Sequence, residues 1–490
     1  MNQLILVLYF FALTGLALYG LFGLLTVVLY LRHRHATFPT PPLPAEPPCV
    51  TVQLPIFNEP FVVERLIHTA VSLHYPPKKL QIQVIDDSTD GTTERAARWV
   101  AYYKERGVNI CLLHRSQRDG FKAGALASAL PQATGEFIAI FDADFQPQPD
   151  FLQQTIPHFA TNPALGMVQT RWGHLNDGRF PLTAAQAIAL DKHFAMEQTV
   201  RHRANLFPKF NGAGGVWRRS CLEDAGGWHT DTVCEDMCLS TRAVLRQWEC
   251  LFLNEVQSPA ELPTTLSAYK SQQARWSKGS SQCLLKYGRS ITTTPHHTLL
   301  ARFYALVSMS AYTTNLLLIL LLLLQIPLLL LNFRFSSWML LFSVAGIGQP
   351  LLFVMSQRVL YKDWLWRLRH FPTMVLIAIG LAPSNGRAIL QALLSRQQAH
   401  EFVRTPKQGN HASSPLFELS FDWLIFVEAG LALYAWAGVA LALRQHNYGP
   451  LFFLGSCALA YSGMVALNMR EWRWHLKQEH RQETAVSPLP

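Results

Sequence analysis

The chain has 490 residues, more than one ordinary domain needs, and half of them are hydrophobic while only 15% are charged. Its formal net charge of +10 does not indicate nucleic-acid binding, because no nucleic-acid module accompanies it and membrane proteins collect Lys and Arg at their cytoplasmic face. The 8 cysteines are scattered without a C-x-x-C pair, which argues against a zinc site and against a disulfide framework.

The first element is an uncharged apolar segment at 4–31. It exceeds the roughly 20 residues that a helix needs to cross the hydrocarbon core. A signal peptide would have a shorter apolar stretch and a small-residue cleavage site, so we expect a retained membrane helix within 1–35. A proline-rich segment follows at 36–48, and its composition predicts an extended spacer.

Short runs of β-branched and apolar residues then alternate with helix-like segments. The runs are 49–55, 82–87, 109–115 and 137–144, and the helix-like segments are 62–73, 92–106 and 124–133. This alternation is typical of a parallel α/β sheet, in which ligands bind beyond the carboxyl ends of the strands. We predict one such domain over 49–290.

Acidic residues stand at the ends of two of these runs. Asp86 and Asp87 end the second run, where a carboxylate can accept hydrogen bonds from a nucleobase or a ribose hydroxyl. Asp142 and Asp144 end the fourth run, and carboxylates at this spacing can hold one hard divalent cation that takes its other ligands from water and phosphate. A polar turn or a helix cap would use the same residue types, but two such clusters at one edge of a sheet favour a binding site.

Two more groups in the α/β domain have the chemistry of a catalytic site. Lys122 lies on a glycine-flanked loop from which it could reach diphosphate oxygens, unless it is an ordinary solvated lysine. The pair Glu235 and Asp236 could supply the base that takes a proton from an attacking hydroxyl, or it could cap a helix.

A third polar group precedes the second membrane segment. On a helix, Gln272, Arg275 and Trp276 share one face and present an amide, a cationic fork and a flat indole. These groups suit diphosphate and sugar rings, and an Arg/Trp anchor at the membrane interface is the alternative.

Uncharged or nearly uncharged segments resume after the α/β domain. They cover 303–333, 336–357, 423–443 and 448–469, whereas 371–382 is too short to cross and is predicted to lie in the interface. We expect membrane helices within 291–370, an interfacial helix and a loop at 371–415, and two further helices with a basic tail at 416–490. The Lys and Arg of the short loops favour an outside N-terminus and a cytosolic α/β domain. Glu428, inside a span, is costly unless paired, so it is a candidate for a translocation path or for a cytosolic interfacial position.

The ordered set Asp87, Asp142-x-Asp144, Glu235-Asp236 and Gln272-x-x-Arg275-Trp276 resembles the D, DxD, ED and QxxRW motifs of family 2 glycosyltransferases with a GT-A fold. The resemblance extends through 53–59, 141–147 and 211–218 and is closest to cellulose-synthase-like enzymes of the glucan and glucomannan synthase branch. It covers roughly 49–407 and implies a GT-A domain between transmembrane helices.

The resemblance also implies roles. The nucleotide sugar would contact Phe57, Asn58, Glu59, Asp87, Asp142, Asp144 and Arg275. Asp86 and Lys122, proposed above from their own chemistry, complete the predicted binding set. Asp142 and Asp144 would hold the diphosphate through Mg²⁺ or Mn²⁺, and Asp236, beside Glu235, would be the catalytic base. The acceptor would contact Gln272, Trp276 and Trp217.

A further resemblance concerns Phe402, Thr405 and Lys407, which match the gating loop of processive synthases, although an ordinary basic loop would also fit. Some positions depart from the family pattern. Phe57 stands where Tyr is usual, and Cys238 replaces a usual Asp. These departures leave the carboxylates in place.

We predict an inverting, metal-dependent transfer of a hexose to a growing β-linked glycan that the helices pass outward. Glucose from UDP-glucose is favoured over mannose from GDP-mannose. Transfer of a single sugar to a membrane lipid is a second interpretation, and a non-enzymatic transporter or glycan sensor is a third. The expected partners are a nucleotide sugar, a glycan or lipid acceptor and membrane lipid, without nucleic acid.

Overall fold

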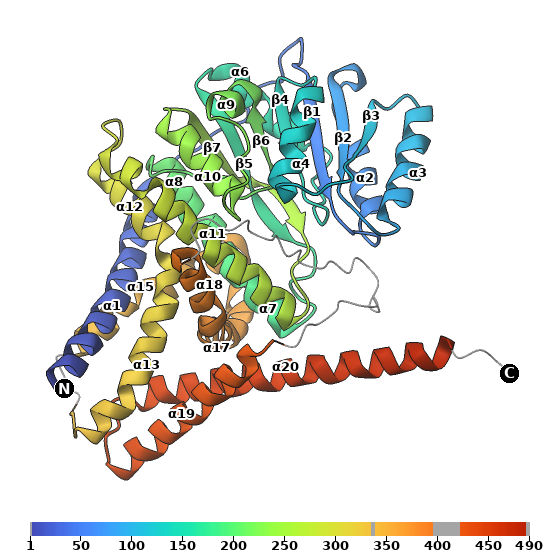
Figure 1. Cartoon of the computed structure of the whole chain (residues 1–490). Coiled ribbons are helices and arrows are strands. Elements are labelled where there is room, and N and C mark those ends of the chain that lie inside the picture. Colours follow the sequence, from blue (N-terminus) through green and yellow to red (C-terminus); the bar gives the residue numbers. More distant parts are fainter. Residues whose placement is uncertain (1, 335–338, 395–421, 487–490) are drawn as a thin grey trace.

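The protein consists of an α/β domain placed over a bundle of apolar helices, as the computed structural model shows (Figure 1). The structure describes residues 2–334, 339–394 and 422–486. Helix α1 (Asn2–His33) belongs to the bundle, and the chain then enters the α/β domain, which it leaves along helix α11 (Leu266–Thr293). The remaining described helices return to the bundle (Figure 1).

The α/β domain has a seven-stranded mixed sheet in the order β3-β2-β1-β4-β6-β5-β7. The strands are β1 (Val50–Ile56), β2 (Leu80–Asp86), β3 (Ile110–His114), β4 (Phe137–Ile140), β5 (Leu165–His174), β6 (Gly215–Arg218) and β7 (Glu249–Ala260). Strands β1 to β4 pair in parallel, and β6 runs antiparallel to both β4 and β5. This is the GT-A-like arrangement that the sequence predicted, and the first four strands lie within two residues of the predicted runs at their N-terminal ends.

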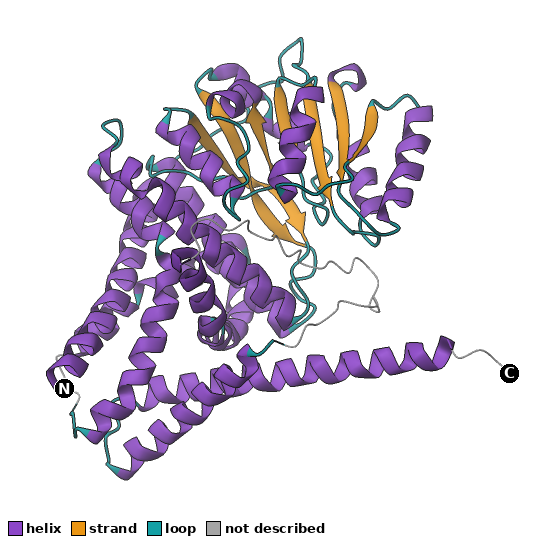
Figure 2. Ribbon diagram, in the orientation of Figure 1, coloured by secondary structure: helices purple, strands orange, loops and turns teal. Residues whose placement is uncertain are grey.

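Helices cover both faces of this sheet (Figure 2). They are α2 (Val63–Val71), α3 (Thr92–Glu105), α4 (Phe121–Ala129), α5 (Phe151–Thr155), α6 (Pro157–Thr161), α7 (Pro181–Asp191), α8 (Thr199–Arg203), α9 (Arg219–Asp224) and α10 (Glu235–Leu245), with a π-helix, η3 (Lys192–Gln198), between α7 and α8. One face packs into an apolar core around Leu54 and Val84, and the other joins a core that continues into the bundle through Tyr30 and Tyr304. The α/β domain and the bundle therefore share buried apolar surface.

The other helices of the bundle follow in chain order. They are α12 (Leu299–Met309), α13 (Thr314–Leu330), α14 (Leu340–Gly346), α15 (Gly348–Leu360), α16 (Trp364–Arg367), α17 (Phe371–Gly380), α18 (Ala382–Leu394), α19 (Leu424–Arg444) and α20 (Leu451–Val486). Helix α1 approaches α15 very closely, since a Cβ on Gly348 would stand 2.1 Å from the carbonyl oxygen of Gly20. Small residues permit such close contacts between membrane helices.

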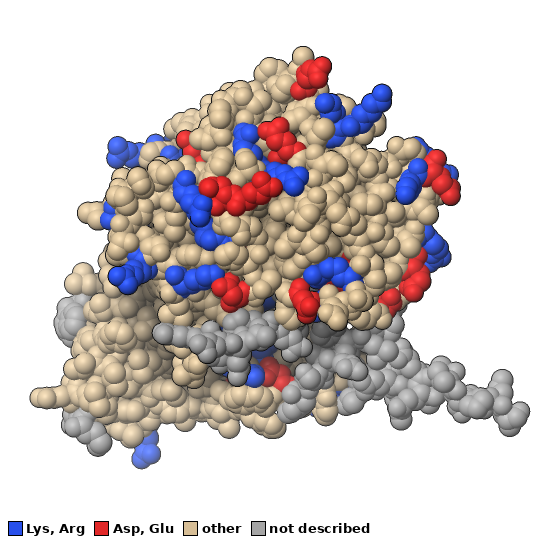
Figure 3. All heavy atoms as spheres, turned by 45° about the horizontal axis from the view of Figure 1, so that its top comes forward, with Lys and Arg blue, Asp and Glu red and all other residues tan. Residues whose placement is uncertain are grey.

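Among the described residues, four helices are long and apolar enough to cross a membrane: Gln3–His33, Ala311–Leu330, Leu424–Arg444 and Leu451–Trp474. The predicted span at 336–357 is divided instead between α14 and α15. The chain is therefore a membrane-associated protein, and charged side chains are concentrated over its α/β domain on the face that Figure 3 shows.

The predicted interfacial segment at 371–382 continues further than expected. Pro383 through Gly386, which follow the predicted segment directly, lie inside α18, and α18 follows α17 after a bend of 41°. Pro383 is compatible with this position because a proline in the first turn of a helix removes an N–H that has no partner within the helix. The bent pair can be a broken span or a re-entrant segment.

Candidate active site

Parallel strand pairing brings most of the predicted site residues to one edge of the sheet. Strands β2, β1 and β4 are neighbours, so their carboxyl ends lie side by side. One pocket at this edge is lined by Phe57, Glu59, Asp87, Lys122, Asp142, Asp144, Glu235, Asp236, Gln272, Arg275 and Trp276. Residues from six separate parts of the sequence thus converge on a single cavity.

The two aspartates at the end of β2 have different surroundings. Asp87 lines the pocket and receives a bidentate interaction from Arg115, with Nε to Oδ1 at 2.6 Å and a second nitrogen to Oδ2 at 2.5 Å. Asp86 is fully buried beneath it and accepts hydrogen bonds from Thr93 and His114 at 2.6 and 2.8 Å. Burial opposes its ionisation, but hydrogen bonds from Ser88, Thr93 and His114 outweigh this and hold the pKa of Asp86 below its usual value.

The structure therefore corrects the expected placement of Asp86 and of Asn58, neither of which lines the pocket. Asp86 stabilises the turn after β2. The backbone N–H of Asn58 donates to Ser88 Oγ at 2.8 Å, and its side-chain oxygen accepts from the N–H of Thr89 at 2.8 Å. Asn58 thus ties the loop after β1 to the loop after β2 and shapes the site indirectly.

Lys122 links the aspartate pair to the other side of the pocket. Its Nζ lies 2.5 Å from Asp142 Oδ1 and donates to the carbonyl oxygen of Gly212 at 3.0 Å. Burial alone would lower the pKa of Lys122, but the nearby carboxylates of Asp142 and Glu235 raise it above its ordinary value. A permanent cation is therefore held where the sequence predicted the diphosphate.

Asp142 and Asp144 fit a divalent cation that completes its ligand set with the donor. Both line the pocket, and the side chain of Asp142 is 34% exposed while Asp144 is 6% exposed. No group of three or more His, Cys, Asp or Glu side chains that could hold a metal occurs among the described residues. A hard cation such as Mg²⁺ needs only one or two carboxylates when phosphate and water supply its other ligands.

Glu235 and Asp236 form the first turn of α10 on the opposite side of the pocket. Asp236 has a pKa raised to about 7, chiefly because it is buried and also because Glu235 repels its negative charge. A carboxyl group with this pKa suits proton transfer near neutral pH.

Helix α11 positions Gln272, Arg275 and Trp276 along the side of the pocket that faces the helix bundle. Its N-terminus is held by Glu471 of α20, whose carboxylate accepts the backbone N–H groups of Leu266 and Ser267. These first-turn donors have no partners within the helix, so an acidic side chain from another element satisfies them.

The same helix is tied to the bundle by a buried ion pair. Lys270 Nζ lies 2.6 Å from Glu428 Oε1 and 3.4 Å from Asp422, and Asn468 donates to the other oxygen of Glu428 at 2.9 Å. Glu428 is fully buried. Glu428, the acid that the sequence places within an apolar segment, is therefore paired with the helix that carries Arg275 and Trp276.

Trp217 is the predicted acceptor residue that the structure places elsewhere. It is fully buried in β6, with its ring 5.2 Å from that of Phe210 and 6.4 Å from that of Trp228, and it does not line the pocket. Side chains alternate across a strand, and Trp217 points into the core. Phe402, Thr405 and Lys407 lie outside the described residues, so their gating role stays a prediction.

Several pocket residues were not predicted from the sequence. The guanidinium of Arg118 lies 3.5 Å from the centre of the Phe57 ring, a contact for which the ring suffices without the hydroxyl of the usual Tyr. Trp172 and His174 enter from the end of β5, a strand that is not among the runs predicted from the sequence. Arg118 could have been predicted from the sequence, because it lies just before the glycine-flanked loop that contains Lys122.

Comparisons with known proteins agree with this geometry. A family model described as "Glycosyltransferase like family 2" matches residues 47–279. Glucomannan 4-beta-mannosyltransferase 1 of Oryza sativa subsp. japonica is 32% identical over 444 residues, which cover 85% of this chain and 83% of the rice protein. Glucomannan 4-beta-mannosyltransferase 7 of Arabidopsis thaliana is 33% identical over 379 residues, which cover 75% of this chain and 66% of the relative.

A further sequence match is shorter, and a solved structure resembles the fold of this chain. Glucomannan 4-beta-mannosyltransferase 2 of Arabidopsis thaliana is 42% identical over 49% of this chain, and the match spans 46% of that relative. A mannosyltransferase from Pyrobaculum calidifontis, solved with GDP-Man and Mn²⁺, superimposes with a TM-score of 0.56 at 22% identity and covers 80% of this chain and 100% of that one. The shared fold, the converging motifs and the extent of the rice match lead to one assignment: the chain belongs to the family 2 glycosyltransferases, in their cellulose-synthase-like branch.

Proposed function

We propose that this glycosyltransferase moves mannose from GDP-mannose, with inversion, to the end of a growing β-linked glycan. The convergence of Asp87, Asp144 and Asp236 on one pocket above the bundle carries the proposal. The resemblance by sequence favours UDP-glucose, but the relatives described above are named for mannosyl transfer, and the structural neighbour was solved with GDP-Man. Mannose therefore replaces glucose as the preferred hexose.

The two sides of the pocket have different roles in a single nucleophilic displacement at the sugar. An acceptor hydroxyl attacks the anomeric carbon, so a carbon–oxygen bond to the acceptor forms as the bond to the diphosphate breaks. Asp236 accepts the hydroxyl proton, and GDP leaves. Lys122 and Arg275 face the leaving diphosphate, and a divalent cation held by Asp142 and Asp144 would neutralise its developing charge.

The acceptor lies along α11 in this proposal. Gln272 and Trp276 line the membrane side of the pocket, where the indole can stack on a sugar ring while the glycan continues toward the bundle.

We place the α/β domain in the cytosol with the N-terminus outside, which the Lys and Arg of the short loops support. A single cysteine replacing Gln3 in a cysteine-free chain should then react with an impermeant maleimide added to intact cells, and protection of this thiol would reverse the assignment.

A donor screen tests the main proposal. The purified full-length chain would receive labelled GDP-mannose, GDP-glucose or UDP-glucose with a β-linked manno-oligosaccharide and Mg²⁺ or Mn²⁺. We expect elongation of the oligosaccharide from GDP-mannose. Exclusive use of UDP-glucose would contradict GDP-mannose as the donor. A single chloroform-soluble product would contradict a glycan as the acceptor. Absence of both transfer and hydrolysis with every donor would contradict enzymatic activity.

Replacement of Asp144 by Asn should remove most cation-dependent donor binding. The change leaves the side-chain volume but deletes the charge that would bind the cation, so we expect the affinity for GDP in Mn²⁺ to fall by at least about 100-fold. Isothermal titration of GDP with and without Mn²⁺ measures this loss. Asp150→Asn changes the same residue type on the following loop, outside the pocket, and should bind GDP normally. Unchanged Mn²⁺-dependent binding by Asp144→Asn would refute the ligand role.

Replacement of Trp276 by Ala should impair acceptor use more than donor hydrolysis. Loss of an aromatic stacking contact costs about 0.5–1.5 kcal/mol, so the KM for the acceptor should rise about two- to tenfold. Parallel assays of oligosaccharide elongation and of GDP release without acceptor separate the two effects. Trp99→Ala, which removes a partly buried indole of α3 that does not line the pocket, is the control for loss of an indole. An equal loss in both assays would contradict stacking on the acceptor.

A further inference from the structure

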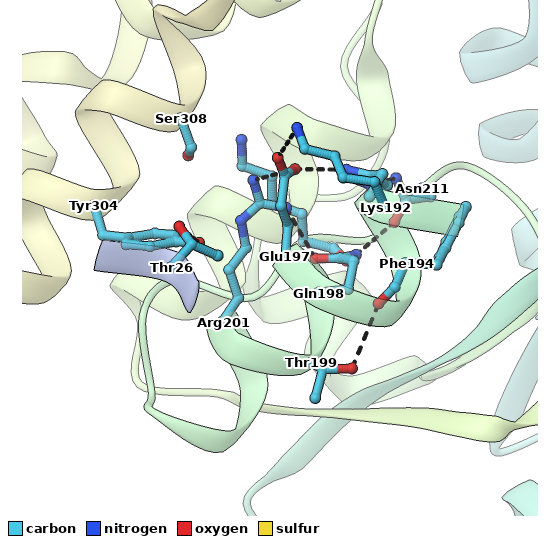
Figure 4. Close-up of polar contacts among 12 residues, drawn as sticks. Thr26, Lys192, Phe194, Glu197, Gln198, Thr199, Arg201, Asn211, Tyr304 and Ser308 are labelled. Carbon is cyan, nitrogen blue, oxygen red and sulfur yellow. Dashed lines mark hydrogen bonds and ion pairs between the residues drawn. The ribbon is translucent and has the colours of Figure 1, made fainter. Parts of the chain in front are cut away.

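A charged network lies along one side of the π-helix η3, at the junction of the catalytic domain and the bundle (Figure 4). In a π-helix the backbone bonds connect residues five apart, and such segments frequently occur at functional sites. Here the wider turn allows Glu197 to face both Lys192, five residues earlier, and His193, four residues earlier. The reaction described above assigns no role to these side chains.

Glu197 is the centre of this network. It forms an ion pair with Lys192, its Oε2 lies 3.0 Å from His193 Nδ1, and Arg201 approaches the same oxygen at 3.6 Å. Burial opposes its ionisation, yet these basic neighbours hold the pKa of Glu197 well below its usual value. On the opposite side of η3, Ala195 and Met196 belong to the apolar core that includes Tyr304 of the bundle.

His193 connects this carboxylate to the pocket wall. Its Nε2 lies 2.9 Å from the side-chain nitrogen of Asn211, a residue that lines the pocket. An amide nitrogen only donates, so His193 Nε2 accepts, and the proton on Nδ1 is directed to Glu197. Gln198 completes the support, because its amide donates to Asn211 Oδ1 at 2.5 Å and to the carbonyl oxygen of Lys209 at 2.7 Å.

The next residue, Gly212, lies between the catalytic groups of the two sides of the pocket. Its carbonyl oxygen accepts from Lys122 Nζ at 3.0 Å. A Cβ at this position would stand 3.0 Å from Asp236 Oδ2, and its φ of +87° is one that other residues rarely adopt. The position of this loop therefore determines the space available between Lys122 and Asp236.

We propose that His193 and Glu197 are positioning residues that hold the Asn211–Gly212 loop and thereby set the separation of Asp236 from Lys122. The inference rests on the proposed role of Asp236 as the base. Neither side chain touches the donor or the acceptor in this proposal. Because a displacement of about 1 Å at an active site can cost about 100-fold in rate, a hydrogen bond to the loop has a measurable effect on catalysis.

Three substitutions at His193 test the proposal. His193→Phe removes both ring nitrogens, His193→Gln can place a side-chain oxygen near the position of Nε2, and His193→Asn can place a nitrogen near Nδ1. We expect kcat to fall about 10- to 100-fold in the Phe and Asn variants, with the KM for the donor within about threefold of the wild-type value. The Gln variant should recover at least about a third of the wild-type kcat. His158→Phe, which changes a buried histidine in α6 outside the pocket, controls for loss of a buried imidazole.

The outcomes separate positioning from a structural role. Three results would overturn the proposal. The first is a wild-type kcat in the Phe variant, and the second is recovery of kcat by Asn but not by Gln. The third is a loss of kcat that follows the loss of Tm in every variant. All assays use the donor that the screen identifies. If Asp236→Asn is inactive while every His193 variant is fully active, only the positioning inference fails. If Asp236→Asn is fully active, the proposed function itself fails.

Discussion

Replacement of Asp236 by Asn is expected to reduce glycosyl transfer by about 100- to 10,000-fold, the usual contribution of a general base. The amide keeps the shape of the side chain but cannot accept the acceptor proton. Donor binding should persist, because the nucleotide would be held by the opposite side of the pocket. Single-turnover transfer with saturating donor measures the rate, and titration with GDP measures binding. Asp231→Asn, an exposed aspartate paired with Lys286 and five residues earlier, is the control for charge removal in this region.

The same residue should give the reaction its pH dependence. Asp236 acts only when deprotonated, and its pKa is raised to about 7 by burial and by the charge of Glu235. The value of kcat/KM should therefore increase with pH through about 7 and level off above it. Glu235→Gln removes a repelling charge, so it should move this midpoint to lower pH. A profile that is flat from pH 5.5 to 8.5, or a midpoint that Glu235→Gln leaves unchanged, would contradict the assignment of Asp236 as the base.

Replacement of Glu428 by Leu should cause the largest loss of stability. It would leave the Lys270 ammonium without its main partner in a site where Lys270 is only 4% exposed. Removal of one member of a buried ion pair typically costs about 3–5 kcal/mol, whereas replacement of both members by apolar residues is often neutral. Because Lys270 lies on α11 two residues before Gln272, we expect loss of activity together with loss of stability.

Thermal unfolding in detergent would compare four proteins: the wild type, Glu428→Leu, the double variant Glu428→Leu with Lys270→Met, and Glu223→Leu as an exposed control on α9. The single variant at position 428 should unfold at a clearly lower temperature, and the double variant should recover most of the difference. A Glu428→Leu protein as stable as the wild type would show that the pair contributes nothing. Equal destabilisation of the single and double variants would assign the effect to lost packing.

The local sequence pattern predicts the first four strands, the acidic residues of the site and most of the apolar spans. Apolar runs separated by helix-like segments predicted β1 to β4, and the rule that ligands bind at the carboxyl ends of parallel strands placed Asp87, Asp142 and Asp144 together. These predictions succeeded because each depends on side chains close in sequence and on the common direction of the strands. Four of the long apolar segments were equally readable, because length and lack of charge alone define a candidate span. The predicted span at 336–357 is the exception, since it is divided between α14 and α15.

Other features depended on contacts between distant segments. Asp86 and Asp87 are adjacent in sequence and have the same side chain, so the sequence cannot assign them different roles. The packing around β2 decides that Asp86 supports the turn and that Asp87 faces the pocket. The burial of Trp217 follows from the antiparallel insertion of β6 between β4 and β5. Lys270 and Glu428 are 158 residues apart, so no local pattern could pair them. Tertiary structure decided these points because burial and pairing are set by which segments meet, and that depends on the free energy of the whole fold.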